Sequence, residues 1–446
     1  MSQPISPLLT DLYQLTMLQA YFEEGLTGMA CFELFVRRLP PGRNFLVAAG
    51  LPSVLDYLEN LHFSEADCAW LAEQPGFTPA FAERLAGLRF TGDVDALPEG
   101  CVFFQDEPVL RIAAPLPEAQ VIETRLINLV QFQTMIASKA ARSVLAAPDK
   151  LLVEFGLRRA HGAEAGLLAA RSAYLAGFAG SSNVLACREY GVPLYGTMAH
   201  AYVMAHASEE EAFLRFAESP AGNLVLLIDT YDTLAAARKL AGLAPRLAER
   251  GIPLRAVRLD SGDLVALSKE VRTILDQAGL TQCHIFASGD LDEDEISRLL
   301  AEGAPIDGFG VGTRLATSVD TPYLSCVYKL QEYAGTPRRK RSAGKATWPG
   351  RKQVFRAYDA AGRMRRDLLA EIGEQAEGEP LLRPVMRAGQ RLDPPEPLDA
   401  ARERLRRQLG QLPDSLRSLD TEAAYAVEVS PGLRQLAGRL DAGAVD

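Results

Sequence analysis

Arg258-Leu-Asp-Ser-Gly-Asp-Leu264 follows a short, mainly apolar run at residues 254–257. A second copy of its core, Ala287-Ser-Gly-Asp-Leu291, follows residues 284–286. Ser and Asp beside Gly favour tight turns, because their side chains cap free backbone amides and Gly tolerates positive φ. Each stretch therefore predicts a strand that ends in a polar turn and leads into a helix. Two strand ends with the same hydroxyl, glycine and carboxylate predict one shared pocket.

The sequence around these turns predicts further units of the same kind. Between residues 150 and 330, strand-like runs alternate with helical stretches rich in Ala and Leu, and strands that alternate with helices imply a parallel sheet. Seven units favour a closed, irregular barrel over an open sheet. The expected strands are residues 151–154, 177–180, 193–198, 223–228, 254–257, 284–287 and 306–311.

Polar residues follow each expected strand. In a parallel barrel the carboxyl ends of the strands share one face, which is the active-site face. A purely structural chain has little reason to repeat polar strand ends in every unit. We therefore expect one site built from strand ends, among them Glu154, Ser181, His200, Asp229 and Asp260.

The predicted fold class is α/β, with an irregular parallel (β/α) barrel at residues 136–344 and a second, α+β domain. Residues 1–135 form this second domain. A family resemblance, given below with its motifs, implies that part of residues 345–446 completes it with a return strand and C-terminal helices that pack on both domains. Apolar spacing from Pro117 to Ala147 predicts one long helix that leads into the barrel.

Composition limits the function classes. The chain has 446 residues and a net charge of −10, which argues against general affinity for nucleic acid. Its six cysteines are scattered, which fits a reducing cytosol. Residues 1–7 lack the basic and apolar regions of a signal peptide, and no apolar run approaches the ~20 residues of a spanning helix. We expect a cytoplasmic protein that binds neither nucleic acid nor membrane.

The motifs together identify a family, because the chain resembles nicotinate phosphoribosyltransferase nearly from end to end. Any one motif is weak, but seven in the same order are specific. They are Leu9-Thr-Asp-Leu-Tyr-Gln14, Glu154-Phe-Gly-Leu-Arg-Arg159, Gly180-Ser-Ser-Asn183, Gly196-Thr-Met-Ala-His200, Ile228-Asp-Thr-Tyr-Asp232, Arg258-Leu-Asp-Ser-Gly-Asp263 and Gly308-Phe-Gly-Val-Gly-Thr313.

The resemblance implies an ATP-coupled enzyme of NAD salvage. Nicotinate, 5-phosphoribosyl 1-pyrophosphate, ATP and water would give nicotinate mononucleotide, diphosphate, ADP and phosphate through a phosphohistidine. It also implies Mg²⁺, and a homodimer whose active sites lie at the subunit interface.

The glycines and carboxylates at the strand ends each have two interpretations. Gly289, Gly310, Gly312 and Thr313 fit a cradle for a 5′-phosphate, because glycine lets backbone N–H groups approach phosphate closely; the alternative is a tight turn. The aspartates are candidates for ribose hydroxyls or for Mg²⁺, which takes one or two carboxylates plus substrate phosphates; the alternative is helix capping. Asp260 is the strongest of them, ahead of Asp263 and Asp290.

The arginines suit a carboxylate or a phosphate. A guanidinium binds either group bidentately, which favours Arg158 and Arg258. By resemblance, Phe155 and Arg158 line the pyridine pocket, and Tyr13 stacks on the ring from the other subunit. The alternatives are barrel core for Phe155 and helix packing for Tyr13. The other expected substrate-binding residues are Ser181, Ser182, Ser261 and Ser288.

Ser182 and His200 carry the most specific expectations. In relatives that use nicotinamide, an aspartate aligns with Ser182, and a neutral Ser suits the anionic acid instead. The resemblance places His200 at the phosphorylated histidine, whose ring Asp229 would orient. His200, Asp260 and Arg258 form the predicted catalytic set.

Other interpretations stay open. The same fold could use nicotinamide or quinolinate, or the chain could be a non-catalytic dimeric scaffold. A barrel aldolase would need a strand-end lysine, which the sequence lacks. The basic segment 338–352 is either a solvated loop or a loop whose Lys345, Arg351 or Lys352 meets nucleotide phosphate.

Overall fold

The computed structural model of the chain describes residues 6–219 and 224–443. Residues 1–5, which belong to the stretch without signal-peptide features, lie outside the described residues, as does residue 223 of an expected strand. The chain divides into two compact units, which are residues 1–135 with 323–446 (unit 1) and residues 136–322 (unit 2). No helix in the described ranges is both long and apolar enough to cross a membrane.

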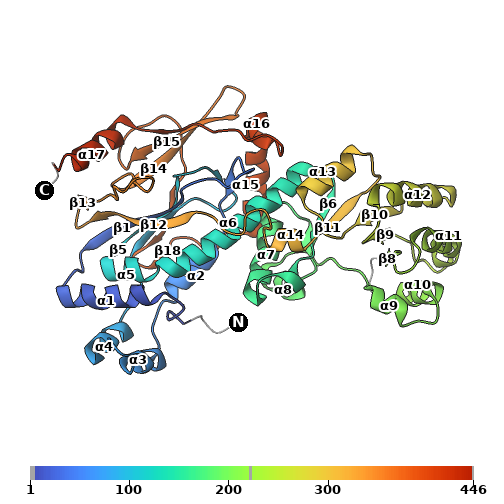
Figure 1. Cartoon of the computed structure of the whole chain (residues 1–446), viewed down its shortest axis with the longest axis horizontal. Coiled ribbons are helices and arrows are strands. Elements are labelled where there is room, and N and C mark those ends of the chain that lie inside the picture. Colours follow the sequence, from blue (N-terminus) through green and yellow to red (C-terminus); the bar gives the residue numbers. More distant parts are fainter. Residues whose placement is uncertain (1–5, 220–223, 444–446) are drawn as a thin grey trace. The chain divides into compact units, whose positions relative to one another are not determined.

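Unit 2 is built on a curled, six-stranded parallel sheet (Figure 1). Every neighbouring pair in it is parallel, as the alternation of strands and helices predicts. In spatial order the strands are β7 (Gly180–Ser181), β6 (Leu151–Glu154), β11 (Gly308–Val311), β10 (His284–Ala287), β9 (Ala256–Leu259) and β8 (Val225–Leu227).

The gap between β7 and β8 is spanned by the segment expected to form the strand at residues 193–198. It appears only as an isolated parallel bridge between Leu194 and Ser181. Further along it, the Thr197 hydroxyl donates to the carbonyl of Val225 over 2.6 Å. Pro193 has no N–H to donate to a ladder, which weakens regular pairing here. The barrel is therefore irregular, as predicted.

Helices follow the strands of unit 2 and pack around the sheet (Figure 1). Helix α6 (Glu123–Ala146) leads into the unit, and the expected helix from Pro117 is divided at Ile122 into α5 (Leu116–Val121) and α6. The others are η1 (Leu157–Arg159), α7 (Ala163–Ala176), α8 (Val184–Tyr190), α9 (His200–Met204), α10 (Glu209–Glu218), α11 (Thr233–Glu249), α12 (Leu264–Gln277), α13 (Glu293–Ala301) and α14 (Thr313–Ala316).

Unit 1 joins strands from both parts of the chain, which confirms the predicted second α+β domain. Its main sheet has seven strands, and all its pairs are antiparallel. They are β13 (Thr336–Pro337), β12 (Cys326–Tyr333), β1 (Met29–Val36), β5 (Pro108–Pro115), β3 (Asp93–Ala96), β17 (Arg383–Arg387) and β18 (Gln390–Arg391). Residues 323–344, which the sequence analysis assigned to the barrel, belong to unit 1 because β12 pairs with β1.

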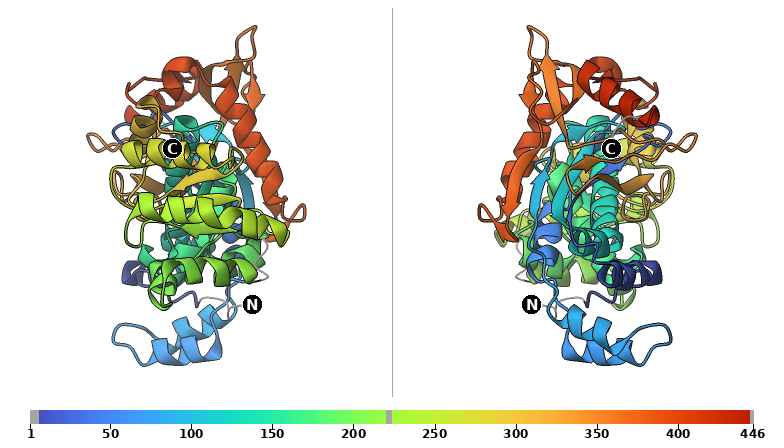
Figure 2. Two further views of the ribbon diagram at one scale, coloured as in Figure 1. Left: turned by 90° about the vertical axis from the view of Figure 1, so that its right-hand side faces the viewer. Right: turned by 90° about the vertical axis from the view of Figure 1, so that its left-hand side faces the viewer.

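Two smaller sheets and the remaining helices complete unit 1. The hairpin of β14 (Lys352–Tyr358) and β15 (Met364–Glu371) projects in Figure 2, flanked by β16 (Glu379–Pro380) and β19 (Val427–Val429). Strands β2 (Leu46–Val47) and β4 (Val102–Phe103) form a separate pair. The helices are α1 (Leu12–Glu24), α2 (Leu51–Glu59), α3 (Glu65–Ala72), α4 (Pro79–Ala86), α15 (Leu398–Gln411), α16 (Asp414–Arg417) and α17 (Pro431–Asp441).

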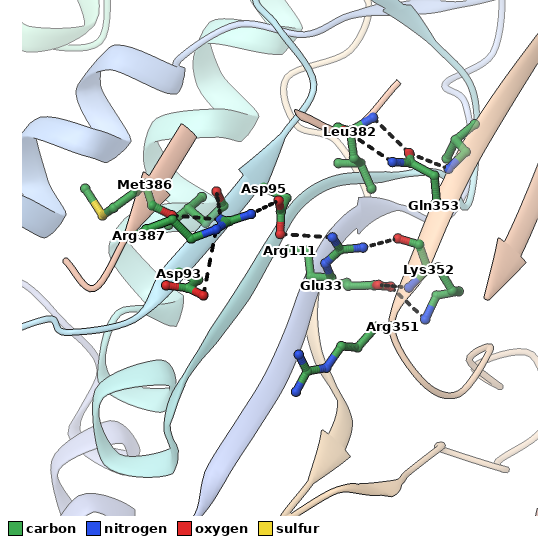
Figure 3. Close-up of polar contacts among 12 residues, drawn as sticks. Glu33, Asp93, Asp95, Arg111, Arg351, Lys352, Gln353, Leu382, Met386 and Arg387 are labelled. Carbon is green, nitrogen blue, oxygen red and sulfur yellow. Dashed lines mark hydrogen bonds and ion pairs between the residues drawn. The ribbon is translucent and has the colours of Figure 1, made fainter. Parts of the chain in front are cut away.

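A row of alternating charges crosses neighbouring strands of the main sheet (Figure 3). Arg111 on β5 pairs with Asp95 on β3 over 2.9 Å, and Asp95 also accepts from Arg387 on β17 over 2.8 Å. Arg111 also donates to the carbonyl of Lys352 at the start of β14. These contacts fasten strands of the C-terminal segment to strands of the N-terminal segment.

Lys352 belongs to this buried arrangement. Its ammonium donates to the carbonyls of Trp348 and Gly350, both over 2.8 Å, and lies 2.7 Å from the buried carboxylate of Glu33. The two carbonyls take two of its three donors, and the Glu33 carboxylate neutralises its charge. Arg351 pairs with Glu332 over 2.8 Å. Within the basic segment, Lys352 is therefore a structural residue and is not available to nucleotide phosphate.

A second buried charge cluster lies under the β14–β15 hairpin. Arg356 and Asp367 form an ion pair of 2.6 Å in which both side chains are fully buried. Glu107 is buried beside them, and its carboxylate accepts from the N–H of Phe104 over 2.9 Å. Burial, and next the charge of Asp367, raise the pKa of Glu107 well above its ordinary value. Glu107 is therefore held in its neutral form beside one ion pair.

Glu107→Gln should remove a pH-dependent loss of stability, because Gln mimics the protonated acid. Because the pKa of Glu107 is raised in the folded state, its protonation stabilises the fold. This contribution is fully present below the unfolded-state pKa of about 4.3 and is lost as the pH rises through the folded-state pKa. Urea unfolding between pH 4 and 8 measures this. Asp367→Asn should instead destabilise by about 3–5 kcal/mol, because it leaves Arg356 buried without its partner. Equal pH slopes in wild type and Glu107→Gln would contradict the assignment.

Candidate active site

The carboxyl ends of the barrel strands lie along one edge of the unit 2 sheet, as their parallel register requires. Glu154 is level with both Ser181 and Val311, and Leu259 is level with Ala287. The polar residues that follow these positions therefore gather at the same edge.

Asp260 is the centre of the hydrogen bonds at this edge. Its carboxylate accepts from the Arg258 guanidinium over 2.7 Å and from the hydroxyl of Ser288, and Arg258 also donates to Ser288 over 2.7 Å. The backbone N–H of Asp260 donates to Asp229 over 3.1 Å, and the Ser261 hydroxyl donates to the same oxygen over 2.5 Å. These contacts tie together the ends of β8, β9 and β10.

The charge state of Asp260 follows from these contacts. Burial is the largest influence and opposes ionisation, but the Ser288 hydrogen bond and the charge of Arg258 outweigh it and lower the pKa of Asp260. Asp260 is therefore an anion at neutral pH. Strand β9 begins at Ala256, two residues later than expected, so Arg258 lies within the strand and not just after it.

Gly289 is required by close packing at this edge. Its φ is +102°, and a Cβ there would lie 2.3 Å from the carbonyl oxygen of Asp260. No real Cβ approaches backbone so closely, so only glycine allows the turn after β10 to pass beside Asp260. Asp290 follows with φ +47°, a left-handed conformation that is uncommon for a residue other than glycine.

His200 begins α9 beside the same carboxylates. Its Nδ1 lies 3.1 Å from the Thr230 hydroxyl, while its Nε2 lies 3.8 Å from Asp260 and 4.0 Å from Asp229. The nearer Asp229 oxygen, Oδ1, is buried and accepts no hydrogen bond from the described residues. Thr230 was not singled out from sequence, although it lies in the quoted polar stretch after β8.

Two aromatic rings, those of Phe155 and Phe286, lie next to Arg258. The guanidinium carbon of Arg258 is 5.5 Å from the ring centre of Phe155, and Phe155 packs against Phe286 with ring centres 5.9 Å apart. A Cβ on Gly310 would lie 2.5 Å from the Phe155 ring, so Gly310 leaves the room that this ring occupies. Phe155 is half-buried, which leaves part of it accessible.

Glu154 and the serines lie at the ends of β6 and β7. Glu154 is fully buried, and it accepts from the Ser181 hydroxyl and from the N–H of Gly156. Burial raises the pKa of Glu154. Ser181 also accepts from the N–H of Asn183, so its hydroxyl is engaged on both sides. Ser182 is half-buried, and its hydroxyl makes one long contact, 3.4 Å to the Glu154 carbonyl.

The remaining predicted residues have different environments. Arg158 is exposed on η1 and makes no side-chain hydrogen bond or ion pair within the described chain. Asp263 caps α12, accepting from Val265 and Ala266 over 3.1 Å, which is its expected capping role. Gly312 and Thr313 form the turn into α14. Tyr13 belongs to unit 1, where it is 48% exposed on α1.

These features define a class of protein. An irregular parallel barrel with an ionised aspartate, a guanidinium, a histidine and glycine turns at its strand-end edge is an enzyme fold suited to small anionic, phosphate-bearing molecules. Within the described residues, no group of three or more His, Cys, Asp or Glu side chains forms a metal cage.

Comparison with known proteins gives the family. Sequence profiles of the nicotinate phosphoribosyltransferase N-terminal domain, family domain and C-terminal domain match residues 8–131, 151–336 and 372–437. The chain is 50% identical to a nicotinate phosphoribosyltransferase of Mycobacterium tuberculosis, over 96% of this chain and 92% of that one. It is 43% identical to the enzyme of that name from Bacillus subtilis, over 84% and 78% of the two chains.

Solved structures agree with these relatives. The human nicotinic acid phosphoribosyltransferase superposes with a TM-score of 0.88 at 32% identity, over 97% of this chain and 100% of that one. A nicotinate-nucleotide pyrophosphorylase from Pyrococcus furiosus superposes with a TM-score of 0.75 at 26% identity, over 91% and 95%. The chain belongs to the nicotinate phosphoribosyltransferase family, and it is an enzyme of that type.

Gly289→Ala should destabilise the protein far more than Gly279→Ala. Both glycines have positive φ, so each alanine costs about 1–2 kcal/mol of backbone strain. A Cβ at Gly279 meets nothing within 4 Å, whereas one at Gly289 meets the Asp260 carbonyl at 2.3 Å. Urea unfolding should show an additional loss of at least about 2 kcal/mol for Gly289→Ala. If both variants lose the same free energy of unfolding, the close approach of Gly289 to Asp260 does not contribute to stability.

Proposed function

We propose that this chain joins nicotinate to the phosphoribosyl group of 5-phosphoribosyl 1-pyrophosphate, coupled to ATP hydrolysis. The observation that carries the proposal is the convergence of His200, Asp229, Asp260 and Arg258 at one strand-end edge, with distances of 2.7–4.0 Å between their side chains. Family membership supports nicotinate and phosphoribosyl transfer, since the relatives are named nicotinate phosphoribosyltransferase.

The sugar phosphate would bind at the glycine turns. Backbone N–H groups of the turns at Gly289 and at Gly310–Gly312 would donate to a 5′-phosphate. The sides of Gly289 and Gly310 that lack a Cβ are occupied by the Asp260 carbonyl and the Phe155 ring. Asp260, ionised by its partners, would hold ribose hydroxyls and stabilise positive charge as the pyrophosphate departs from C1. Ser261 and Ser288 lie on either side of Asp260 and would add hydroxyl contacts.

The pyridine ring would bind on Phe155, beside Arg258. A flat heteroaromatic ring stacks favourably on an aromatic face, and a guanidinium binds the carboxylate bidentately. The free guanidinium of Arg158 is the second candidate for that carboxylate. Tyr13 of a second copy would cover the other face of the ring, which is supported by its exposure on α1 together with that of Leu12.

ATP would react at His200. An imidazole nitrogen attacks the γ-phosphorus, the bond to the β-γ bridging oxygen breaks, and ADP leaves; water later cleaves the phosphohistidine to phosphate. Thr230 holds Nδ1 and would therefore fix the orientation of the ring. Asp229 lies on the other side of the ring and would orient it.

Magnesium fits the carboxylates at this edge. Asp229 Oδ1 is buried and accepts no hydrogen bond from the described residues, and the second oxygen of Asp260 faces the same histidine. Mg²⁺ uses one or two carboxylates and takes its remaining ligands from phosphates and water. Of the predicted ligands Asp260 and Asp290, these contacts support Asp260, which would hold the ion; when bound, the ion would neutralise charge on the polyphosphate.

The partners and location follow the same proposal. The chain would act as a homodimer with active sites at the subunit interface, and it would act in the cytoplasm. A reducing compartment is supported by six cysteines, all of them free thiols. Nicotinamide and quinolinate remain the alternative bases. Turnover on the three bases decides between them, and a higher kcat/KM for either alternative would overturn the proposal.

His200→Ala should abolish ATP hydrolysis and its coupling while slow, ATP-independent transfer remains. The variant cannot form the phosphohistidine, but it keeps the Asp260 network. The measurement is nicotinate mononucleotide formation with and without ATP, together with ADP release. His206→Ala is the control, because among the described residues the His206 ring hydrogen-bonds only to the carbonyl of Tyr202. Wild-type stimulation by ATP in His200→Ala would refute the role.

Ser182→Asp should lower kcat/KM for nicotinate by about 100-fold or more. A carboxylate introduced here would face an anionic substrate, and like charges in such contact cost several kcal/mol. Ser182→Asn is the matched control, since it has the same shape without the charge, and should retain most activity. If Asp and Asn reduce activity equally, the effect is steric and Ser182 does not select the acid.

A further inference from the structure

A polar cavity in unit 1 is lined by none of the barrel residues described above. It has a volume of about 150 Å³, roughly ten times the space that one water needs. Strands β14, β16 and β17 and helix α15 contribute its lining, which includes Tyr358, Glu379, Arg383, Arg404, Arg407 and Gln411. A cavity of this size holds a ligand of several non-hydrogen atoms.

The helix presents its polar side chains to the cavity at helical spacing. Arg404, Arg407 and Gln411 follow one another at intervals of three and four residues, so they form one stripe on α15. The opposite stripe, with Leu405 and Leu409, is buried against the unit. The orientation of the stripe is therefore set by the hydrophobic packing of the helix.

Two of the arginines are already paired. Arg404 donates to the carbonyl of Glu99 and pairs with Glu396. Arg383 donates to Glu379 over 3.1 Å, and Glu379 also accepts from the Tyr358 hydroxyl over 3.2 Å. Within each pair the two charges neutralise one another, and the contacts fix the side chains that line the cavity.

Arg407 is the exception. Within the described chain its guanidinium makes no hydrogen bond and no ion pair, although it lines the cavity. Arg383 keeps donors beyond the one it gives to Glu379, and the Gln411 amide makes no hydrogen bond within the described residues. The lining of the cavity therefore has unused donors on Arg383, Arg407 and Gln411, and Arg407 is exposed to solvent.

We propose that this cavity is a binding site for a small oxyanion, with a phosphate group as its ligand and Arg407 as its principal contact. A guanidinium fork matches a phosphate, and Arg383 and Gln411 complete the donor set. The ligand is inorganic phosphate or the phosphate of a free nucleotide. Because no barrel residue lines the cavity, occupancy here is independent of the reaction proposed above.

Arg407→Gln tests the site, with Arg406→Gln as the matched control. Arg406 is the preceding residue on α15, does not line the cavity, and pairs with Glu403 over 2.7 Å. Calorimetric titration of the full chain with inorganic phosphate, and separately with AMP, distinguishes the two sources. For at least one of these ligands, the Kd of Arg407→Gln should be at least ten times that of wild type. The Kd of Arg406→Gln should lie within twofold of wild type.

A second variant protects the test from a folding artefact. Gln411→Glu places a negative charge in the cavity and should lower the affinity for the same ligand. Its melting temperature without ligand should equal that of wild type. Both variants should retain wild-type transfer activity. If Arg407→Gln and Gln411→Glu bind both ligands as wild type does, the site does not exist. The same conclusion follows if wild type shows no binding of phosphate or AMP apart from binding at the barrel.

Discussion

The carboxylate of Asp260 is the interaction on which the candidate site depends. It neutralises the half-buried guanidinium of Arg258 and accepts from Ser288 at the end of the next strand, while the backbone carbonyl of Asp260 lies against the turn at Gly289. Its own N–H donates to Asp229, which faces His200. One residue therefore couples three strand ends, an arginine and a histidine. Without it, Arg258 would keep its charge in a poorly solvated position, and the β10 turn would lose the group that fixes it.

Unit 1 also contains buried charges that are neutralised by partners of opposite charge. Glu33 and Lys352 are separated by 319 residues but form one buried pair, and Arg356 and Asp367 form another within the hairpin. Burying such a pair stabilises little in total, whereas removing one partner is costly. That explains why the basic segment before β14 is only partly a surface loop. Its last lysine is needed inside the unit.

Local patterns predicted the strands and their polar ends, but not the contacts between them. Residues 151–154 and 284–287 became β6 and β10 as expected, because each is a short apolar run bounded by turn signals. Residues 193–198 did not form a regular strand, and β9 is displaced by two residues, because pairing partners decide these boundaries. The Thr230–His200 and Ser181–Glu154 contacts join residues 30 and 27 positions apart, so no local signal reveals them. Family motifs indicated the residues; the fold supplies their partners.

The strand order also separates charge along the active edge. Strands β8 and β9 lie at one side of the sheet and bring the Asp229 and Asp260 carboxylates beside His200. Strands β6 and β7 lie at the other side, where burial raises the pKa of Glu154 and Ser181 and Ser182 are neutral. An anionic pyridine carboxylate is repelled at the first side and tolerated at the second, with Arg258 reaching the Phe155 ring between them. A metal-bound polyphosphate has the opposite preference, since its cation requires the carboxylates. Under the proposed function, the order of strands in the sheet would therefore place the two substrates at different ends of the site.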